Sequence, residues 1–251
     1  MKLDPRHTLV LALALLLPAC AGMNLNQDFP PAEAAVPAPG ERWTYRVVNG
    51  YNGLEVGKTA YEVVSAAGDR FEVRVTDDRS GRSQTRAFLR GWNPESGQYP
   101  VGLAMGGLWN GISPGGPVRY LPPLPDFRFP LAPGKSWSET VAAADPVTGQ
   151  QIPVKVVGRV QGMERIRVPA GEFDTIKVIR DLYYQDSKWW RTSVWQTSTD
   201  WFAPAINRVV RHREHSQYTD LTRGGNDGCR RYALRFALAQ LKSLNLPCRG
   251  L

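Results

Sequence analysis

The stretch Arg167-Val168-Pro169-Ala170-Gly171-Glu172-Phe173-Asp174-Thr175-Ile176-Lys177-Val178-Ile179-Arg180 decides the fold class. It begins as the end of one strand, turns, and continues as a second strand. Pro169 restricts φ and Gly171 can take a positive φ, so the backbone chemistry itself specifies the turn. After Phe173 the apolar side chains alternate loosely with polar ones, the period of a strand with one buried face. The stretch predicts a β-hairpin and contains no general base, nucleophile or metal-ligand cluster.

Strand-like segments of the same kind recur on both sides of this hairpin, separated by turn residues. We predict strands at 41–48, 59–65, 70–76, 84–90, 138–142, 152–160, 164–168, 173–184, 190–202 and 208–216. Many strands with turn punctuation and no helical pattern between them are typical of an antiparallel sheet. The sequence therefore predicts a mainly β protein, an antiparallel curved sheet or incomplete barrel, within a domain spanning 41–225.

This β domain divides into two candidate halves, 41–92 and 134–216. The motif Pro-Gly-x-x-Trp introduces each of them, at 39–43 and at 133–137. A duplication would explain this echo, and so would a repeated way of starting a strand.

Residues 93–133 form a long Pro/Gly-rich stretch between the two halves, with Trp109 among its apolar residues. A stretch of this length without regular structure is uncommon unless it packs or functions. We expect either a fixed cover laid over one face of the sheet or a mobile lid over an apolar cavity.

The C-terminal stretch 226–251 differs from the rest of the chain. Leu234, Leu238 and Leu241 fall at helical spacing, with Gly228 before the segment and Pro247 after it. This pattern predicts one short C-terminal helix over 230–244.

The N-terminus predicts export. Residues 1–19 combine a short basic region with an apolar run too short to span a bilayer, as in a signal peptide. Leu17-Pro18-Ala19-Cys20 resembles the bacterial lipobox, which implies lipidation of Cys20; an ordinary signal peptide with an incidental cysteine is the alternative. By the same resemblance Ala21, which is not aspartate, favours the outer membrane, facing the periplasm. Residues 20–40 hold four prolines and no periodicity, so we expect a flexible tether.

The three cysteines suit this compartment. If Cys20 carries lipid, Cys229 and Cys248 remain, and an even remainder in an oxidising compartment predicts a disulfide. The predicted helix would then be tied down by this bond. Two unpaired thiols are the alternative.

The charge balance favours anionic partners. Without residues 1–19 the basic count is 31 − 2 = 29 and the acidic count 23 − 1 = 22, which leaves a net charge of +7. Lipid headgroups and envelope polysaccharides fit this charge. Nucleic acid is not expected as a partner, because the predicted compartment is the envelope.

Motifs for catalysis are few in the sequence. It contains no His-Glu-x-x-His and no Gly-rich phosphate loop, and its one match to the letters of Gly-x-Ser-x-Gly, at 111–115, lies in the irregular Pro/Gly-rich stretch rather than at a strand-to-helix turn. His212 and His215 would bind metal only on a helix; on the predicted strand they point to opposite faces. We expect no enzyme, no cofactor and no metal, although carboxylate pairs that meet only in space keep an envelope hydrolase as an alternative.

The tryptophans provide the best indication of function. Trp189, Trp195 and Trp201 share parity, so an unbroken strand would place all three on one face, together with Arg191. With Trp109 from the long stretch, this polar and aromatic mixture could hold a lipid chain or the face of a sugar. The alternative is that the wide rings fill the core of a curved sheet.

Three motifs carry a family resemblance. They are Val-Pro-Ala-Gly-x-Phe-Asp at 168–174, the stretch 120–137 that ends in Pro-Gly-Lys-Ser-Trp, and Asp-Trp-Phe-Ala-Pro-Ala-Ile-Asn-Arg-Val-Val-Arg at 200–211. Together they resemble a group of uncharacterised bacterial envelope lipoproteins, over roughly residues 40–215. The expected architecture is also similar in kind to the half-barrels of periplasmic lipoprotein carriers of the LolA type.

The group has no established activity, so the resemblance implies a place rather than a reaction. We expect a non-catalytic outer-membrane lipoprotein that binds an apolar or amphiphilic envelope ligand, lipid or glycan, or that assists envelope assembly. A scaffold that binds an envelope protein partner, without a small ligand, is the first alternative.

Overall fold

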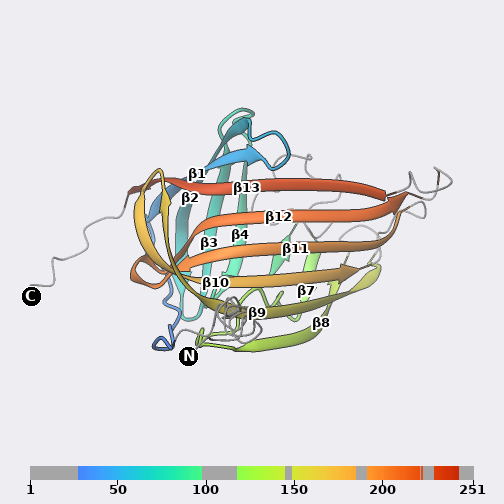
Figure 1. The fold of residues 1–251 in the computed structure, drawn as a ribbon, viewed down its shortest axis with the longest axis horizontal. Helices are drawn as coiled ribbons and strands as arrows, with labels where there is room; N and C mark the ends of the chain where they lie inside the picture. The colour runs from blue at the N-terminus through green and yellow to red at the C-terminus, as the bar shows by residue number, and fades with distance from the viewer. Residues whose placement is uncertain are drawn as a thin grey trace, which may run out of the picture.

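The computed structural model describes residues 28–97, 118–144, 149–184, 191–220, 222 and 229–242. They form one antiparallel sheet of 13 strands in the order β5-β4-β3-β2-β1-β13-β12-β11-β10-β9-β8-β7-β6 (Figure 1). The strands are β1 (Arg42–Asn49), β2 (Glu55–Ala67), β3 (Arg70–Asp77), β4 (Ser83–Leu89), β5 (Asn93–Pro94), β6 (Ser96–Gly97), β7 (Val118–Leu121), β8 (Ser136–Ala144), β9 (Gln151–Val168), β10 (Gly171–Tyr184), β11 (Arg191–Ala203), β12 (Arg208–Asp220) and β13 (Cys229–Lys242). The predicted mainly β, antiparallel and strongly curved sheet is confirmed.

The two ends of this strand order meet, so the sheet is nearly closed into a barrel-like shape. β5 and β6 lie at opposite ends of the order but are separated in the chain by Glu95 alone. The Glu95 N–H donates to the Ala87 carbonyl in β4 at 3.0 Å, and its carbonyl accepts from the Tyr120 N–H in β7 at 2.9 Å. Glu95 therefore connects β4, near one end of the strand order, to β7, near the other end.

The hairpin that decides the fold class is present, and it is longer than predicted. β9 and β10 pair from Gly171↔Val168 to Tyr184↔Val154. β9 runs unbroken where the sequence predicted two strands, because a bulge at Lys177/Val178 absorbs the irregularity near Gly162. Figure 1 shows this hairpin, in yellow, curling past the ends of β11 and β12. At its tip the Ala170 N–H donates to the Leu238 carbonyl of β13 at 3.1 Å.

The predicted C-terminal helix is wrong. The segment forms β13, which pairs with β1 on one side and with β12 on the other. It therefore joins the two candidate halves into a single sheet (Figure 1). Among the described residues the helical structure is the 3-10 turn η2 (Pro204–Ile206) between β11 and β12.

Much of the predicted cover packs inside the fold. Of residues 93–133, the stretch 98–117 with Trp109 lies outside the described residues. The remainder contributes β5, β6 and β7 and several buried side chains, which include Leu124, Phe127 and Leu131. The described part of the stretch therefore packs into the core, and the choice between cover and lid stays open for 98–117, which lie outside the described residues.

The predicted tether also packs in its second part. Phe29 and Ala32 are buried, and Ala32 exchanges two backbone hydrogen bonds with Leu131, at 3.0 and 2.8 Å. The Asn207 side chain accepts from the Ala35 N–H at 3.1 Å and donates to its carbonyl at 2.6 Å. Residues 28–40 therefore belong to the folded body, while 20–27 lie outside the described residues.

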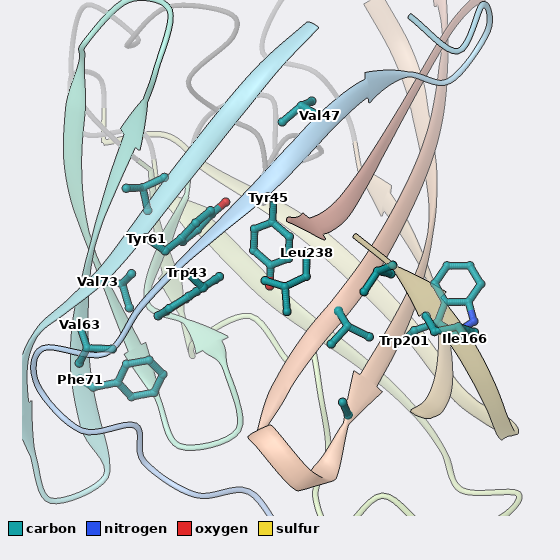
Figure 2. Packing of buried hydrophobic residues seen from close by; sticks show 14 residues of the cluster. Trp43, Tyr45, Val47, Tyr61, Val63, Phe71, Val73, Ile166, Trp201 and Leu238 are labelled. Atoms are coloured by element: carbon teal, nitrogen blue, oxygen red, sulfur yellow. The ribbon is translucent and has the colours of Figure 1, made fainter. Parts of the chain in front are cut away.

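Aromatic rings fill the space between the two halves of the sheet. Trp43 stacks on Tyr61 with ring centroids 5.3 Å apart, and Tyr45 meets Tyr61 edge-on at 5.2 Å. Figure 2 shows these rings on one side of the cluster, and Trp201 beside Ile166 on the other.

Several predictions fall outside the described residues: the signal peptide 1–19, Cys20, Cys248, Trp109 and Trp189. Cys229 begins β13, and its predicted partner Cys248 is not described. No helix within the described ranges is long and apolar enough to cross a membrane.

Candidate functional site

An ionic cluster lies inside the sheet, where strand alternation directs charged residues inward. Asp200 of β11, His212 and Glu214 of β12 and Arg180 of β10 are all buried, as is Asp126 of the segment after β7. Arg180 Nη1 donates to Asp126 and Nη2 to Asp200. His212 Nδ1 lies 2.7 Å from Asp200 Oδ1, and Nε2 lies 3.5 Å from Glu214 Oε2. We call these five residues the Arg180 network.

The pKa values within the network follow from burial and from the charged neighbours. Burial alone would lower the pKa of His212, but the Asp200 and Glu214 carboxylates outweigh it and raise the pKa to about 9. Burial alone would raise the pKa of Asp200, but Arg180 and His212 lower it to about 2. Burial raises the pKa of Asp126 and of Glu214, against the effect of their cationic partners. At neutral pH, His212 is therefore a cation bound to an ionised Asp200.

The network fixes the segment that carries Asp126 to the inner face of the sheet. It joins the neighbouring strands β10, β11 and β12 to the segment that carries Asp126, which lies 54 positions before Arg180 in the sequence. Sequence reasoning considered His212 only as a metal ligand and did not identify Arg180, Asp126 or Asp200. The sequence did contain one signal: Asp200 lies two positions before the apolar Phe202, and His212 and Glu214 lie two and four positions after Val210. On unbroken strands these charged residues would share a face with apolar ones.

A small cavity of about 40 Å³ adjoins this network. Its wall includes Arg86, Asp126, Arg180, Asp200 and Arg208, with aromatic residues that include Trp43 and Tyr45. A cavity of this volume holds water-sized guests and is too small for an acyl chain or a sugar ring. This cavity is therefore too small for the predicted lipid or glycan.

The outer face of β10 and β11 presents an exposed aromatic pair. Tyr183 and Trp195 stack with ring centroids 6.0 Å apart and planes within 11°, and they are 41% and 42% exposed. Trp195 Nε1 donates to Asp181 Oδ1 at 3.3 Å, and Thr197 Oγ1 donates to the same oxygen at 2.6 Å. The pair is therefore held in place with its rings open to solvent.

Trp201 lies on the same outer face as Trp195, as parity predicted, but it is 3% exposed. Its Nε1 donates to Glu164 Oε1 in the β9–β10 hairpin. Three cations surround its ring, Lys177 at 5.5 Å, Arg211 at 5.6 Å and Arg213 at 5.2 Å from the centroid. The indole is a covered anchor for these cations rather than an open binding surface.

Basic residues cross the outer face of the sheet in two neighbouring rows. One row of register partners runs Lys177↔Trp201↔Arg211↔Ala237↔Arg46↔Lys58. In the next row Arg213 of β12 is directly opposite Arg235 of β13, and Arg159 of β9 follows beyond β11 and β10. We call these seven cations the basic face: Arg46, Lys58, Arg159, Lys177, Arg211, Arg213 and Arg235.

Acidic residues neutralise only part of the basic face. Glu55 lies 3.8 Å from Arg46, Asp181 lies 3.7 Å from Arg159, and Glu164 lies 4.0 Å from Lys177. Within the described ranges neither Arg213 nor Arg235 forms an ion pair, and both are exposed. Like charges directly opposite one another across two strands destabilise a sheet. Burial and the neighbouring Arg213 lower the pKa of Arg211, which is the electrostatic sign of crowded cations.

A second hollow, of about 300 Å³, lies on the outer side of β1–β3. Its charged residues largely satisfy one another, because Glu62 accepts from Arg42 at 2.5 Å and from Arg74 at 2.9 Å. An anionic ligand would therefore be attracted less strongly to this hollow than to the basic face, because its two arginines already bind a carboxylate.

The remaining predicted site residues can be placed only in part. Arg191 begins β11, and the strand register shifts between Thr192 and Trp195. The argument from an unbroken strand, which placed Arg191 on the face of Trp195, therefore does not apply there. His212 is buried and His215 is exposed, so these two residues lie on opposite faces as predicted. In the part of the chain that the structure describes, no group of three or more His, Cys, Asp or Glu residues is arranged to hold a metal ion.

Comparison with known proteins supports the fold. No protein-family model and no curated protein matches the sequence. A solved structure from Parabacteroides distasonis, described as a lipoprotein, is 15% identical, covers 85% of this chain and 100% of its own, and gives a TM-score of 0.51. An exported protein with a YmcC-like fold from Bacteroides fragilis is 17% identical, with 84% and 100% coverage and a TM-score of 0.47. The hypothetical lipoprotein YmcC from Escherichia coli is 8% identical, with 97% and 100% coverage and a TM-score of 0.37.

At these identities the likeness concerns the fold alone, and the argument uses only the first of the three structures. The similarity to a protein from Parabacteroides distasonis spans the larger part of this chain. The curved sheet is therefore an architecture that this solved protein shares, and the function has to be argued from the surfaces of this chain.

Proposed function

We propose that the protein is a non-catalytic lipoprotein of the bacterial outer membrane, anchored through Cys20, that binds an anionic or amphiphilic envelope ligand on its basic face. The observation that carries this proposal is the like-charged pair Arg213–Arg235, next to the Trp201 cation cluster. A cross-strand pair of arginines without an acidic partner in the described structure is stabilised when an anion lies over it.

The outer surface supports this proposal better than the interior does. The described cavity of about 40 Å³ excludes a lipid chain or a sugar ring. Outside, the exposed Tyr183–Trp195 pair is linked to one cation of the basic face through Asp181, which accepts from Trp195 and lies 3.7 Å from Arg159. An aromatic surface next to basic groups suits a ligand with both apolar and anionic parts, such as a lipid headgroup region or an acidic glycan.

The docked N-terminal segment fits a body that stays close to a membrane. Because residues 28–40 pack on the sheet, only residues 20–27 separate the proposed lipid from the folded body. Eight residues reach at most about 28 Å when fully extended. Lipid headgroups and glycans at the membrane surface are therefore within reach of the protein.

The direct test is co-sedimentation of the soluble form that lacks residues 1–20 with vesicles of phosphatidylglycerol and phosphatidylcholine, and in parallel retention on an immobilised acidic glycan. We expect binding that weakens with salt, since it depends on exposed charges. The double variant Arg213→Gln/Arg235→Gln should bind at least tenfold more weakly. The matched control, Arg165→Gln/Arg167→Gln, removes two arginines that already pair with Asp174 and Glu172, and it should bind normally.

Equal loss of binding in both double variants would show a general charge effect and would contradict a defined site. Binding to neither probe, with a stoichiometric protein partner captured by cross-linking in intact cells, would favour the scaffold role instead. An acidic protein surface would meet the same cations and aromatic rings.

A further inference from the structure

We infer that the ligand of the basic face is a chain of sugar rings that carries acidic groups, and that one of these rings stacks on the exposed Tyr183–Trp195 pair. This inference rests on the proposed function, because the acidic groups of the chain lie on the basic face. It goes further by choosing a glycan over a lipid. It also adds a second contact, which depends on ring faces rather than on charge.

The platform consists of two nearly parallel rings that stay open to solvent. Tyr183 of β10 and Trp195 of β11 are directly opposite each other, with ring planes within 11° and exposed fractions of 41% and 42%. A hydrogen bond to Asp181 holds the indole, so little side-chain freedom is lost when a ligand binds. A pyranose ring has a face of C–H groups that packs on an aromatic face. The pair is therefore a preformed surface for such a ring.

Polar groups surround the two rings, as the hydroxyl groups at the rim of a sugar require. The exposed Lys155 of β9 is directly opposite Tyr183. The half-buried Gln217 of β12 is directly opposite Trp195. Asp181, two positions before Tyr183, accepts from Trp195 Nε1 at 3.3 Å. Ammonium, amide and carboxylate groups together can donate to and accept from hydroxyl groups.

Asp181 also argues against a bilayer as the ligand. Both rings belong to strands of the sheet, and Asp181 Oδ1 lies 3.3 Å from the indole nitrogen of Trp195. A bilayer that buried the rings would therefore bury this carboxylate with them, and removing a carboxylate from water is costly. A sugar ring covers the aromatic faces and leaves its hydroxyl groups beside the carboxylate.

The distance between the platform and the arginine pair suits a chain rather than a single sugar. Trp195 precedes Thr199 by four positions on β11, and Thr199 is directly opposite Arg213. At about 3.3 Å per residue, the platform lies roughly 13 Å along the strands from the Arg213–Arg235 pair. Figure 1 shows β10, β11 and β12 running side by side. One sugar ring is too small to touch both places, whereas a chain of several rings stacks at one and places acidic groups at the other.

Isothermal titration calorimetry on the soluble form that lacks residues 1–20 tests this inference with three probes. Hexagalacturonate carries its carboxylates on sugar rings. Hexaglutamate, acetylated at its N-terminus and amidated at its C-terminus, carries the same number of carboxylates without a ring. Vesicles of phosphatidylglycerol and phosphatidylcholine are the third probe. We expect hexagalacturonate to bind at least tenfold more tightly than hexaglutamate, and this comparison needs no variant.

Variants of the platform then assign that difference to the rings. Trp195→Ala should remove most of the preference for hexagalacturonate and leave the weak binding of hexaglutamate unchanged. Trp195→Tyr, which keeps a ring, should restore most of the preference. The control is Tyr51→Ala, which removes an exposed ring of the turn between β1 and β2 and should bind as the wild type does.

The outcomes separate this inference from the proposed function. Equal affinities for the two hexamers, or a preference that Trp195→Ala does not change, would overturn the inference. If Arg213→Gln/Arg235→Gln still weakened binding of both hexamers, the basic face would stand without the platform. Binding to the vesicles but not to hexagalacturonate would replace the glycan by a lipid on the same face. Binding to none of the three probes would overturn the proposed function and this inference with it.

Discussion

Arg180 shows how one side chain can organise the interior of a curved sheet. Its guanidinium binds Asp126 and Asp200 at the same time, and Asp200 in turn binds His212. Buried charges are costly unless they are paired and hydrogen-bonded, so removal of one member leaves another uncompensated. The stability of the fold should therefore respond to the charge state of these residues.

The free energy of unfolding should depend on pH through the protonation of His212. Its pKa is raised to about 9 in the folded protein, so its contribution is complete below the unfolded value of 6.5 and is lost as the pH rises through 9. The pKa of Asp200 is lowered to about 2, so its contribution is complete above the unfolded value of 3.8 and is lost as the pH falls through 2. His212 and Asp200 together therefore add no pH dependence between roughly pH 4 and 6.5, and above that range the loss of the His212 contribution amounts to about 3 kcal/mol toward pH 9.

Urea unfolding of the wild type and of His212→Gln at pH 6 and pH 9 measures this effect. The variant should be less stable at pH 6 and nearly independent of pH above it. His215→Gln, at an exposed position of the same strand, is the control and should behave as the wild type. A wild type equally stable at both pH values would contradict a protonated His212–Asp200 pair.

At the scale of elements, β13 shows where local pattern stops being informative. The leucines at 234, 238 and 241 have helical spacing, and alanines between them favour a helix. Yet Tyr232, Leu234, Phe236 and Leu238 also alternate with period 2. Local sequence could not choose between the two patterns, because the deciding factor is tertiary: β1 and β12 each need a partner strand.

The strand register of β13 can be tested by engineered cross-links. Arg46 lies directly opposite Ala237, within the Cα separation that a disulfide bridges. Arg46→Cys with Ala237→Cys should therefore oxidise readily in air, as mass spectrometry after alkylation would report. Arg46→Cys with Gln240→Cys, three positions out of register, is the matched control and should stay reduced. The reverse outcome would return this segment to a helix or to a different register.

The pairing of β8 with β9 depends on a glycine. Trp137 lies opposite Gly158, and its indole occupies the place where a side chain would stand, since a Cβ on Gly158 would lie 2.1 Å from the ring. Trp137 Nε1 also donates to the Pro125 carbonyl at 2.9 Å, so the ring cannot move without losing a buried bond.

Gly158→Ala should therefore destabilise the protein by roughly 1–3 kcal/mol, through overpacking of a buried site. Chemical denaturation provides the measurement. Lys155→Ala, an exposed position on the same strand, should change stability by less than about 0.5 kcal/mol. A Gly158→Ala variant as stable as the wild type would show that the indole can be accommodated elsewhere.

The whole molecule combines features that the sequence could and could not reveal. Strand alternation and the Pro-Ala-Gly turn were sufficient to predict an antiparallel curved sheet, because each depends on local chemistry. Closure at Glu95, the docking of residues 28–40 and the joining of the halves by β13 depend on contacts far apart in sequence, and no local pattern carries them. Likewise parity placed Trp195 and Trp201 on one face, but only the fold shows that Trp201 is covered and that Arg213 meets Arg235.

The most direct test of the account is to ask which face of the sheet a ligand touches. Indole N–H signals in NMR spectra report this, because Trp195 is exposed on the outer face while Trp43 and Trp137 are buried in the core clusters. An acidic oligosaccharide and a short-chain phosphatidylglycerol are suitable soluble probes. We predict that at least one of them shifts the Trp195 signal and leaves those of Trp43 and Trp137 in place. Shifts confined to Trp43 and Trp137 would move the site inside the sheet and contradict the basic face as the binding surface.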